Sequence, residues 1–254
     1  MKLALTFLIF GFLGGLAVAA DVPASAPTPV LVELFTSEGC SSCPPADRLL
    51  EELDSKQPIA GAQLIVLSEH VTYWNSDGWK DPFSSQDITD RQNAYGKQFK
   101  LASVFTPQMV VDGESQFTGS DTHSLQESVE KARAQQNIPV KLSSTIDSSG
   151  KLKAHVEASG GSGTVYVVLA LNHAESQVLR GENGGHRLSH VAVVQNFQQI
   201  GTLKKGKEFL KDIEIKIPPG TDPANLRVVA FVQQVDSAYY PGKVVGAALS
   251  MPSK

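Results

Sequence analysis

The sequence predicts an α/β N-terminal domain followed by an all-β, antiparallel, sandwich-like C-terminal domain. Three observations support this prediction. In residues 30–137, short apolar runs typical of buried strands alternate with segments whose apolar residues recur at helical spacing. After Pro139, seven short alternating runs are separated by Gly, Ser, Asn and Pro clusters, which is typical of a sandwich. The only two cysteines lie between the first predicted strand and the first predicted helix.

The chain begins with the pattern of a secretory signal peptide. Lys2 is followed by an apolar run over 3–16 and by four small residues at 17–20. A membrane-spanning helix needs roughly 20 apolar residues, so a permanent anchor is the weaker alternative. We therefore expect residues 1–20 to be removed and the mature protein to be exported, to the periplasm, without a membrane anchor. Residues 21–29 are proline-rich and predict a linker.

Composition limits the classes of function. The net charge is -4, and residues of both signs are interspersed without a basic stripe, so nucleic acid is not an expected partner. Two cysteines three positions apart close only a short ring, which contributes little stability. In the oxidising compartment of an exported protein, this spacing favours redox chemistry over stapling.

The predicted elements of residues 30–137 follow the order β-α-β-α-β-β-α, which is the thioredoxin topology. Asp112-Gly113 predicts a hairpin turn, and Asp121 predicts the N-cap of the last helix. A boundary near residue 138 separates this domain from residues 138–254. Strands are expected over 30–35, 62–67, 109–111 and 115–118, and helices over 46–53, 84–99 and from 121 to about 136.

The segment Cys40-Ser41-Ser42-Cys43 has the spacing of a thiol–disulfide pair. At the start of a helix, the dipole and the free amides favour a thiolate over a thiol. We expect Cys40, on the exposed N-terminal side, to be the attacking thiolate, and Cys43 to resolve the mixed disulfide. Pro44 and Pro45 fix the start of the helix but remove two amide donors, which weakens the stabilisation of a thiolate.

Two further positions are candidates for the catalytic machinery. Thr106-Pro107 stands just before a short strand, where this topology places a cis-proline loop that faces the cysteines. There the backbone of Thr106 would bind an extended peptide or thiol substrate; an ordinary trans proline is the alternative. Glu33 interrupts an apolar strand. If buried under the disulfide it would have a raised pKa and could shuttle a proton to or from Cys43, whereas at a strand edge it would face water.

An aromatic loop follows the second predicted strand and contains both tryptophans of the chain. Its side chains His70, Tyr73, Trp74 and Trp79 are candidates for a substrate-binding lip beside the cysteines. The alternative is packing of the aromatic rings against the helix that follows.

The C-terminal half contains a polar, glycine-rich segment over 180–187. Gly184 and Gly185 predict a tight turn there. Arg180 and Glu182 could form a binding patch, but a turn with a surface ion pair is the preferred interpretation. The spacing of His173, His186 and His190 lacks a zinc or copper signature, so we expect solvent-exposed histidines and no metal or other cofactor.

These motifs together resemble a bacterial family of secreted proteins that is labelled a domain of unknown function and grouped with thioredoxin-like proteins. The resemblance implies a thioredoxin-like fold and a location in the cell envelope, and it implies no substrate. The Ser-Ser pair between the cysteines and the absence of a large aromatic residue at Gly39 differ from thioredoxins proper and fit a narrower substrate range. The matching segments are 32–47, 70–74, 78–83, 106–113 and 180–183.

The leading functional prediction is an exported thiol–disulfide oxidoreductase of restricted range. Its substrate would be a thiol- or disulfide-containing protein or a small thiol, and an external redox partner would recycle its single cysteine pair. One alternative is a copper(I)-handling protein in which Cys40 and Cys43 hold the ion, with His70 or His123 nearby. Another is a non-catalytic binding module with a structural disulfide.

Overall fold

The computed structural model describes residues 26–135, 137–236 and 240–253. The expected signal peptide and most of the expected linker lie outside the described residues. Among the helices of these segments, none is long and apolar enough to cross a membrane.

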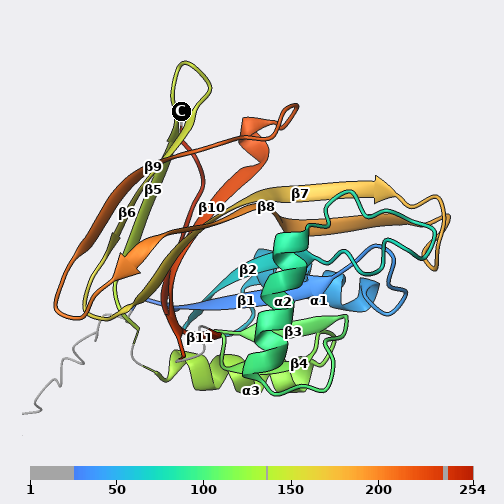
Figure 1. The fold of residues 1–254 in the computed structure, drawn as a ribbon, viewed down its shortest axis with the longest axis horizontal. Coiled ribbons are helices and arrows are strands. Elements are labelled where there is room, and N and C mark those ends of the chain that lie inside the picture. Colours follow the sequence, from blue (N-terminus) through green and yellow to red (C-terminus); the bar gives the residue numbers. More distant parts are fainter. Residues whose placement is uncertain (1–25, 136, 237–239, 254) are drawn as a thin grey trace, which may run out of the picture.

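Strands and helices alternate in the first half of the chain (Figure 1). β1 pairs in parallel with β2 and antiparallel with β3, which gives the local order β2-β1-β3-β4. The elements are β1 (Thr28–Thr36), α1 (Pro44–Lys56), β2 (Ala62–His70), α2 (Gln86–Gln98), β3 (Gln108–Val111), β4 (Ser115–Thr118) and α3 (Thr122–Arg133).

Local sequence signals account for the ends of these elements. α1 begins at Pro44, with proline in its first two positions, where no amide donor is required. The predicted N-cap Asp121 is confirmed, because its carboxylate accepts hydrogen bonds from two amides of the first turn of α3. Asp112 and Gly113 both have positive φ angles, 45° and 69°, and form the tight turn between β3 and β4.

The second half of the chain is composed of strands and one short 3-10 helix. β5 (Val140–Ile146), β6 (Leu152–Ala158) and β9 (Phe209–Ile215) form a three-stranded antiparallel sheet in the order β5-β6-β9. β7 (Gly163–Gln177) and β8 (Arg187–Leu203) form a long hairpin. The 3-10 helix (Pro223–Asn225), β10 (Leu226–Val235) and β11 (Pro241–Ser250) complete the chain, and β10 pairs with both β7 and β11.

One sheet extends across the expected boundary at residue 138. Its eight strands run in the order β11-β10-β7-β8-β2-β1-β3-β4. The connection between the two halves is a parallel pairing of β2 with β8, at Ser68 and Val193. The division into two domains stays a prediction, but the main sheet is common to both halves.

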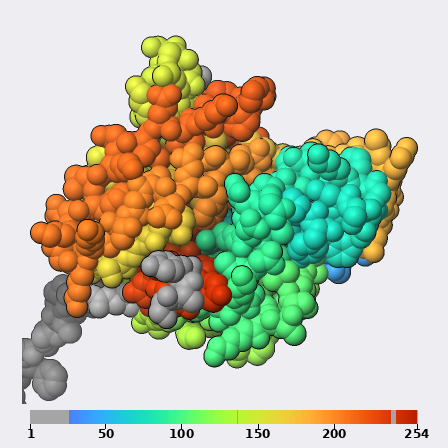
Figure 2. Space-filling view, viewed as in Figure 1, coloured from blue at the N-terminus to red at the C-terminus, as the bar shows by residue number. Residues whose placement is uncertain are grey.

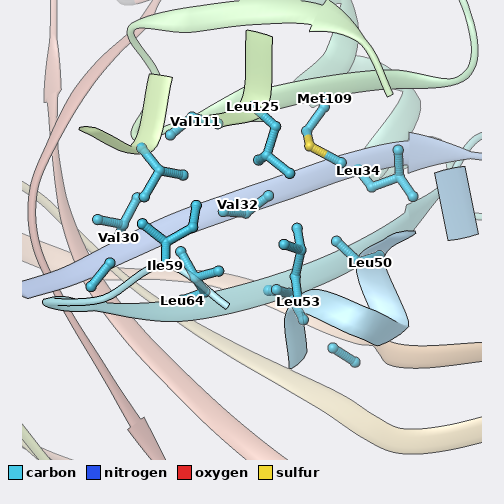
Figure 3. Close-up of a cluster of buried hydrophobic side chains, with 14 of the residues drawn as sticks. Val30, Val32, Leu34, Leu50, Leu53, Ile59, Leu64, Met109, Val111 and Leu125 are labelled. Carbon is cyan, nitrogen blue, oxygen red and sulfur yellow. The ribbon is translucent and has the colours of Figure 1, made fainter. Parts of the chain in front are cut away.

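Side chains on the two faces of β1 enter different hydrophobic clusters. Val30, Val32 and Leu34 pack with residues of α1 and α3 (Figure 3). Leu31 and Phe35 point to the opposite face and pack with α2 and with β7, β10 and β11. A third cluster fills the space between the three-stranded sheet and the C-terminal strands of the main sheet. β1 is thus buried on both faces, and the loop that follows it is anchored at a fixed position.

Candidate redox site

Cys40 and Cys43 form a disulfide at the N-terminus of α1. Their Cα atoms are 5.4 Å apart, and Cys43 is the N-cap of the helix. The hydroxyl of Ser42 lies 3.3 Å from the Cys40 sulfur. Both cysteines have 0% of their surface exposed, so the expectation that Cys40 lies on an exposed side is wrong. The physical reason is a cover formed by two other segments of the chain.

The first part of the cover is the tip of the β7–β8 hairpin, residues 178–186, called here the hairpin tip. The side-chain amide of Asn183 donates hydrogen bonds to the carbonyls of Glu38 and Cys40, at 2.9 and 3.0 Å. The Glu182 carboxylate accepts a hydrogen bond from the Ser41 amide at 2.9 Å. The segment that we expected to be a surface turn therefore binds the cysteine loop, and sequence reasoning missed Asn183 as a site residue.

The second part is the aromatic loop between β2 and α2. Trp74 packs so closely on Gly39 that a Cβ atom at this glycine would lie 2.9 Å from the Trp74 Cβ. The Trp74 indole donates to the Thr106 hydroxyl at 2.7 Å, and the Trp79 indole donates to Glu38 at 2.7 Å. Figure 2 shows this loop beside the hairpin tip at one end of the molecule. Both tryptophans thus hold the surroundings of the cysteines together.

The Thr106-Pro107 loop lies near the same turn, and its peptide bond is cis. A Cβ atom at Gly119 would be 3.1 Å from the Cβ atoms of both Pro107 and Ala46, which places the proline next to the first turn of α1. Tyr73 is 39% exposed and is the most accessible of the predicted substrate-binding residues. The structure therefore brings Pro107, Thr106 and Trp74 together with the cysteine loop.

Buried histidine–carboxylate pairs lie around this loop. His70 bonds to Asp81 at 2.7 Å and to Ser68 at 3.1 Å, so both of its ring nitrogens are engaged. Burial opposes ionisation of Asp81, but His70 outweighs it and lowers the pKa of Asp81 to about 2. Asp81 also accepts the amide of Glu38 at 2.9 Å, which ties the aromatic loop to the cysteine loop. His70 is thus a structural anchor of the loop in this geometry.

His190 on β8 is buried, so the expectation of an exposed histidine is wrong. Its Nε2 lies 3.4 Å from Glu38 and its Nδ1 lies 3.8 Å from Asp47, which stands in the first turn of α1. Burial would lower the pKa of His190, but the two carboxylates raise it to about 10. The imidazole is therefore a cation at neutral pH. The apolar run 191–194 that follows His190 is the sequence signal that could have indicated its burial.

Glu33 is completely buried, so it does not face water. It points toward α2, where its carboxylate accepts hydrogen bonds from Arg91 at 2.6 Å and from Tyr95 at 2.7 Å. α1, which begins at the cysteines, packs on the opposite face of β1. The role of Glu33 as a proton shuttle for Cys43 stays a prediction.

A second buried carboxylate, Glu69, shares the cation of Arg91. It lies 3.9 Å from the Arg91 Nε. Burial and the neighbouring charge of Glu33 hold the pKa of Glu69 well above its ordinary value of 4.5, although Arg91 partly opposes this shift. One arginine thus compensates the charge of one of two carboxylates, and burial favours the protonated form of the second.

This arrangement predicts a pH-dependent stability. Between pH 4.5 and the raised pKa, folding takes up a proton at Glu69, so the free energy of unfolding should fall as pH rises, by about 1.4 kcal/mol per pH unit. We expect Glu69→Gln to make this slope less steep in urea unfolding curves recorded upward from pH 5, while the raised pKa values of Asp112 and His190 leave a residual slope of the same sign. Glu52→Gln, at an exposed glutamate, should leave it unchanged. A slope as steep in Glu69→Gln as in the wild type would contradict the assignment.

The copper(I) alternative depends on whether His70 or His123 could bind an ion held by the cysteines. Within residues 26–135, 137–236 and 240–253, no group of three or more His, Cys, Asp or Glu side chains is arranged to hold a metal ion. His70 has both nitrogens engaged. His123 is exposed on α3, where it pairs with Glu127. His70 therefore has no free ring nitrogen to offer a metal ion at the cysteines.

Residues 31–233 match a family described as "Protein of unknown function (DUF1223)". The chain belongs to this family. No curated protein sequence is significantly similar to the chain. The crystal structure of a structural genomics target from Agrobacterium tumefaciens is similar, with a TM-score of 0.72 and 25% identity over 89% of this chain and 95% of that one.

A second solved structure, HBP35 of Porphyromonas gingivalis, has a TM-score of 0.63 and 18% identity. The similarity covers 90% of this chain and 76% of that one, and it concerns the fold alone. Both similarities extend over the two halves of the DUF1223 chain. A fold similar to that of both halves together is therefore found in experimental structures.

Proposed function

We propose that this DUF1223 protein is an exported thiol–disulfide oxidoreductase with a thioredoxin-like N-terminal half and a restricted substrate range. The observation that carries the proposal is the position of the Cys40–Cys43 disulfide. It closes one turn at the N-terminus of α1, directly after a strand buried on both faces, and the Thr106-Pro107 loop lies beside the same turn. Such a site can open and re-form its bond with little movement of the backbone.

The reaction needs only the two cysteines and a substrate. In the reducing direction, the Cys40 thiolate attacks a substrate disulfide, and one substrate sulfur leaves as a thiolate. The Cys43 thiolate then attacks the Cys40 sulfur, the second substrate thiolate leaves, and the Cys40–Cys43 bond forms. The reverse sequence oxidises two substrate thiols and leaves both cysteines reduced. In either direction, an external thiol or disulfide partner must restore the pair.

The hairpin tip and the aromatic loop, which cover the disulfide, support a restricted range of substrates. A substrate sulfur must approach the disulfide along its bond axis, and both sulfurs are shielded by the hairpin tip and the aromatic loop. Tyr73 and Leu179, which are 39% and 70% exposed, stand on these two segments and offer apolar contacts to an approaching partner. We therefore propose a partner that displaces or fits this cover, with export to the periplasm as the setting.

The decisive experiment is equilibration of the mature protein with a glutathione series, together with an assay of exchange on a small disulfide. A reduction potential of about -120 to -230 mV with measurable exchange would support a working oxidoreductase. Cys40→Ser should abolish the exchange, because no attacking sulfur remains. Exchange at an unchanged rate in Cys40→Ser would exclude the proposed mechanism.

The complete burial of both cysteines favours a second candidate, a non-catalytic binding module with a structural disulfide. Structural disulfides have potentials below about -300 mV. A potential in that range, combined with no detectable exchange, would support this second candidate over the first.

A further inference from the structure

We propose that Glu182, on the hairpin tip, opposes the thiolate form of Cys40 and thereby directs the cysteine pair toward the reduction of substrate disulfides. This inference rests on the proposed function and assigns a direction to it. Glu182 would be a residue that sets the chemistry of a neighbouring sulfur, since its carboxylate contacts the cysteine loop at Ser41. It belongs to the second half of the chain, far from the cysteines in sequence.

The turn at the cysteines offers few hydrogen-bond donors to a thiolate. Pro44 and Pro45 have no amide hydrogen, so the first turn of α1 lacks two donors that could stabilise a thiolate. The amides of Cys40, Cys43, Ala46 and Asp47 donate to backbone carbonyls within the same loop.

The amide of Ser41, the residue directly after Cys40, donates to the Glu182 carboxylate at 2.9 Å. An anion therefore already uses this donor. A Cys40 thiolate would therefore lie close to the negative charge of Glu182. The neighbouring Asn183 holds the hairpin tip against the cysteine loop through its hydrogen bond to the Cys40 carbonyl.

Charged side chains surround the cysteine loop. Hydrogen bonds from Ser41 lower the pKa of Glu182, so its carboxylate is ionised at neutral pH. Around the cysteine loop lie three further carboxylates, Glu38, Asp47 and Asp81, with the buried His190 cation between the first two. The adjoining segments also carry Asp77 and Lys80 on the aromatic loop, Arg48 on α1, His70, paired with Asp81, and Arg180 and His186 on the hairpin tip.

Among these groups, Glu182 is the one whose carboxylate accepts the amide of the residue next to Cys40. The Ser42 hydroxyl, 3.3 Å from the Cys40 sulfur, is the one neutral donor that contacts it among the described side chains. This environment disfavours a new negative charge on Cys40.

The pKa of the Cys40 thiol affects whether the cysteine pair oxidises or reduces a substrate. When the protein oxidises a substrate, the Cys40 thiolate is displaced from a mixed disulfide, and a thiol of higher pKa is a poorer leaving group. When the protein reduces a substrate, the electrons of the two cysteine thiols pass to the substrate disulfide, and the Cys40–Cys43 bond forms. An anion beside Cys40 destabilises the reduced pair when Cys40 is a thiolate, so it favours the disulfide and makes the pair a stronger reductant. A dithiol partner must then supply electrons to the pair.

The test uses Glu182→Gln in the full mature chain. The glutamine side chain retains an oxygen that accepts the Ser41 hydrogen bond, so the hairpin tip should remain docked while the charge is removed. We expect the pH midpoint of Cys40 alkylation to fall by about half to one unit. The equilibrium against glutathione, measured at a pH above that midpoint, should shift about threefold to tenfold toward the reduced protein. Both shifts should shrink at 1 M salt, because Glu182 is exposed.

The matched control is Glu175→Gln. Glu175 is an exposed carboxylate on the same hairpin, where it pairs with Arg187. Glu175→Gln should change neither the pH midpoint of Cys40 alkylation nor the equilibrium against glutathione. Equal shifts in both variants, or no shift in Glu182→Gln, would overturn the inference. Failure of the proposed function has a different signature, because the wild-type protein would then catalyse no exchange whatever Glu182→Gln does to the alkylation midpoint.

Discussion

Replacement of Arg91 by alanine is expected to lower the free energy of unfolding by about 3–5 kcal/mol, measured by urea denaturation at pH 7. The guanidinium is buried and donates to Glu33, to the Tyr95 hydroxyl at 3.0 Å and to Gln233 at 3.2 Å. Its removal leaves the Glu33 carboxylate buried and without a counter-charge. A buried charge that has lost its partner is much more costly than a surface ion pair is favourable.

Arg91 also packs among aromatic rings, so the loss of stability in Arg91→Ala combines lost packing with lost charge. A further set of variants separates these two contributions. The guanidinium carbon lies 4.5 Å from the ring centre of Phe197 and 5.5 Å from that of Phe231. Arg91→Met retains much of the volume, and combining it with Glu33→Gln and Glu69→Gln removes every charge of the cluster. We expect this triple variant to recover most of the loss seen in Arg91→Met alone.

An exposed arginine on α1 provides the surface control for this series. Arg48→Ala should change stability by less than about 0.5 kcal/mol. If the triple variant were no more stable than Arg91→Met, packing rather than charge would be the role of Arg91.

Asn183→Ala is expected to increase the rate at which a dithiol reduces the Cys40–Cys43 bond by about tenfold to hundredfold. Asn183 makes two hydrogen bonds to carbonyls of the cysteine loop, and each such bond is worth about 0.5–1.5 kcal/mol. Because both sulfurs are buried, reduction requires the cover to open, and a weaker attachment raises the open fraction in proportion. The measurement is the pseudo-first-order rate of reduction with excess dithiothreitol.

Gln177→Ala is the matched control for this experiment. Gln177 donates its side-chain amide to Gly185 within the same hairpin and does not contact the cysteine loop through that bond. We expect its reduction rate to equal that of the wild type. If Asn183→Ala were reduced no faster than Gln177→Ala, opening of the hairpin tip would not control access to the disulfide.

The sequence predicts the parts of this molecule that local chemistry determines. The apolar run of β1, the prolines that begin α1 and the cap at Asp121 are each a signal within a few residues of its effect. The β7–β8 hairpin is less predictable. Only 164–171 and 190–195 show a strand pattern, but the strands extend to Gln177 and Leu203. The end of β7 at Gln177 pairs with the start of β8 at Arg187, and the end of β8 at Leu203 pairs with the start of β7 at Gly163.

The site shows the same limit more clearly. Cys40 and Cys43 are evident from their spacing, whereas their burial depends on a hairpin tip 143 positions away from Cys40. Glu33 is recognisable as a charge in an apolar strand, but its partner Arg91 is 58 positions further along the chain. The pairing of β2 with β8 joins the long hairpin to the first half of the chain, and no local pattern specifies which strand will pair with β2.

The cysteines and the hairpin tip that covers them are far apart in sequence, and this separation affects the order in which the disulfide forms and the hairpin tip docks. As the chain emerges, both thiols are present before residues 178–186 exist, and they remain open to an external oxidant until the hairpin tip docks. A chain that docks its hairpin tip while still reduced would shield its thiols and acquire the disulfide slowly. Oxidative folding should therefore proceed most efficiently when the bond forms first, so that the docking of the hairpin becomes the step that completes the protein.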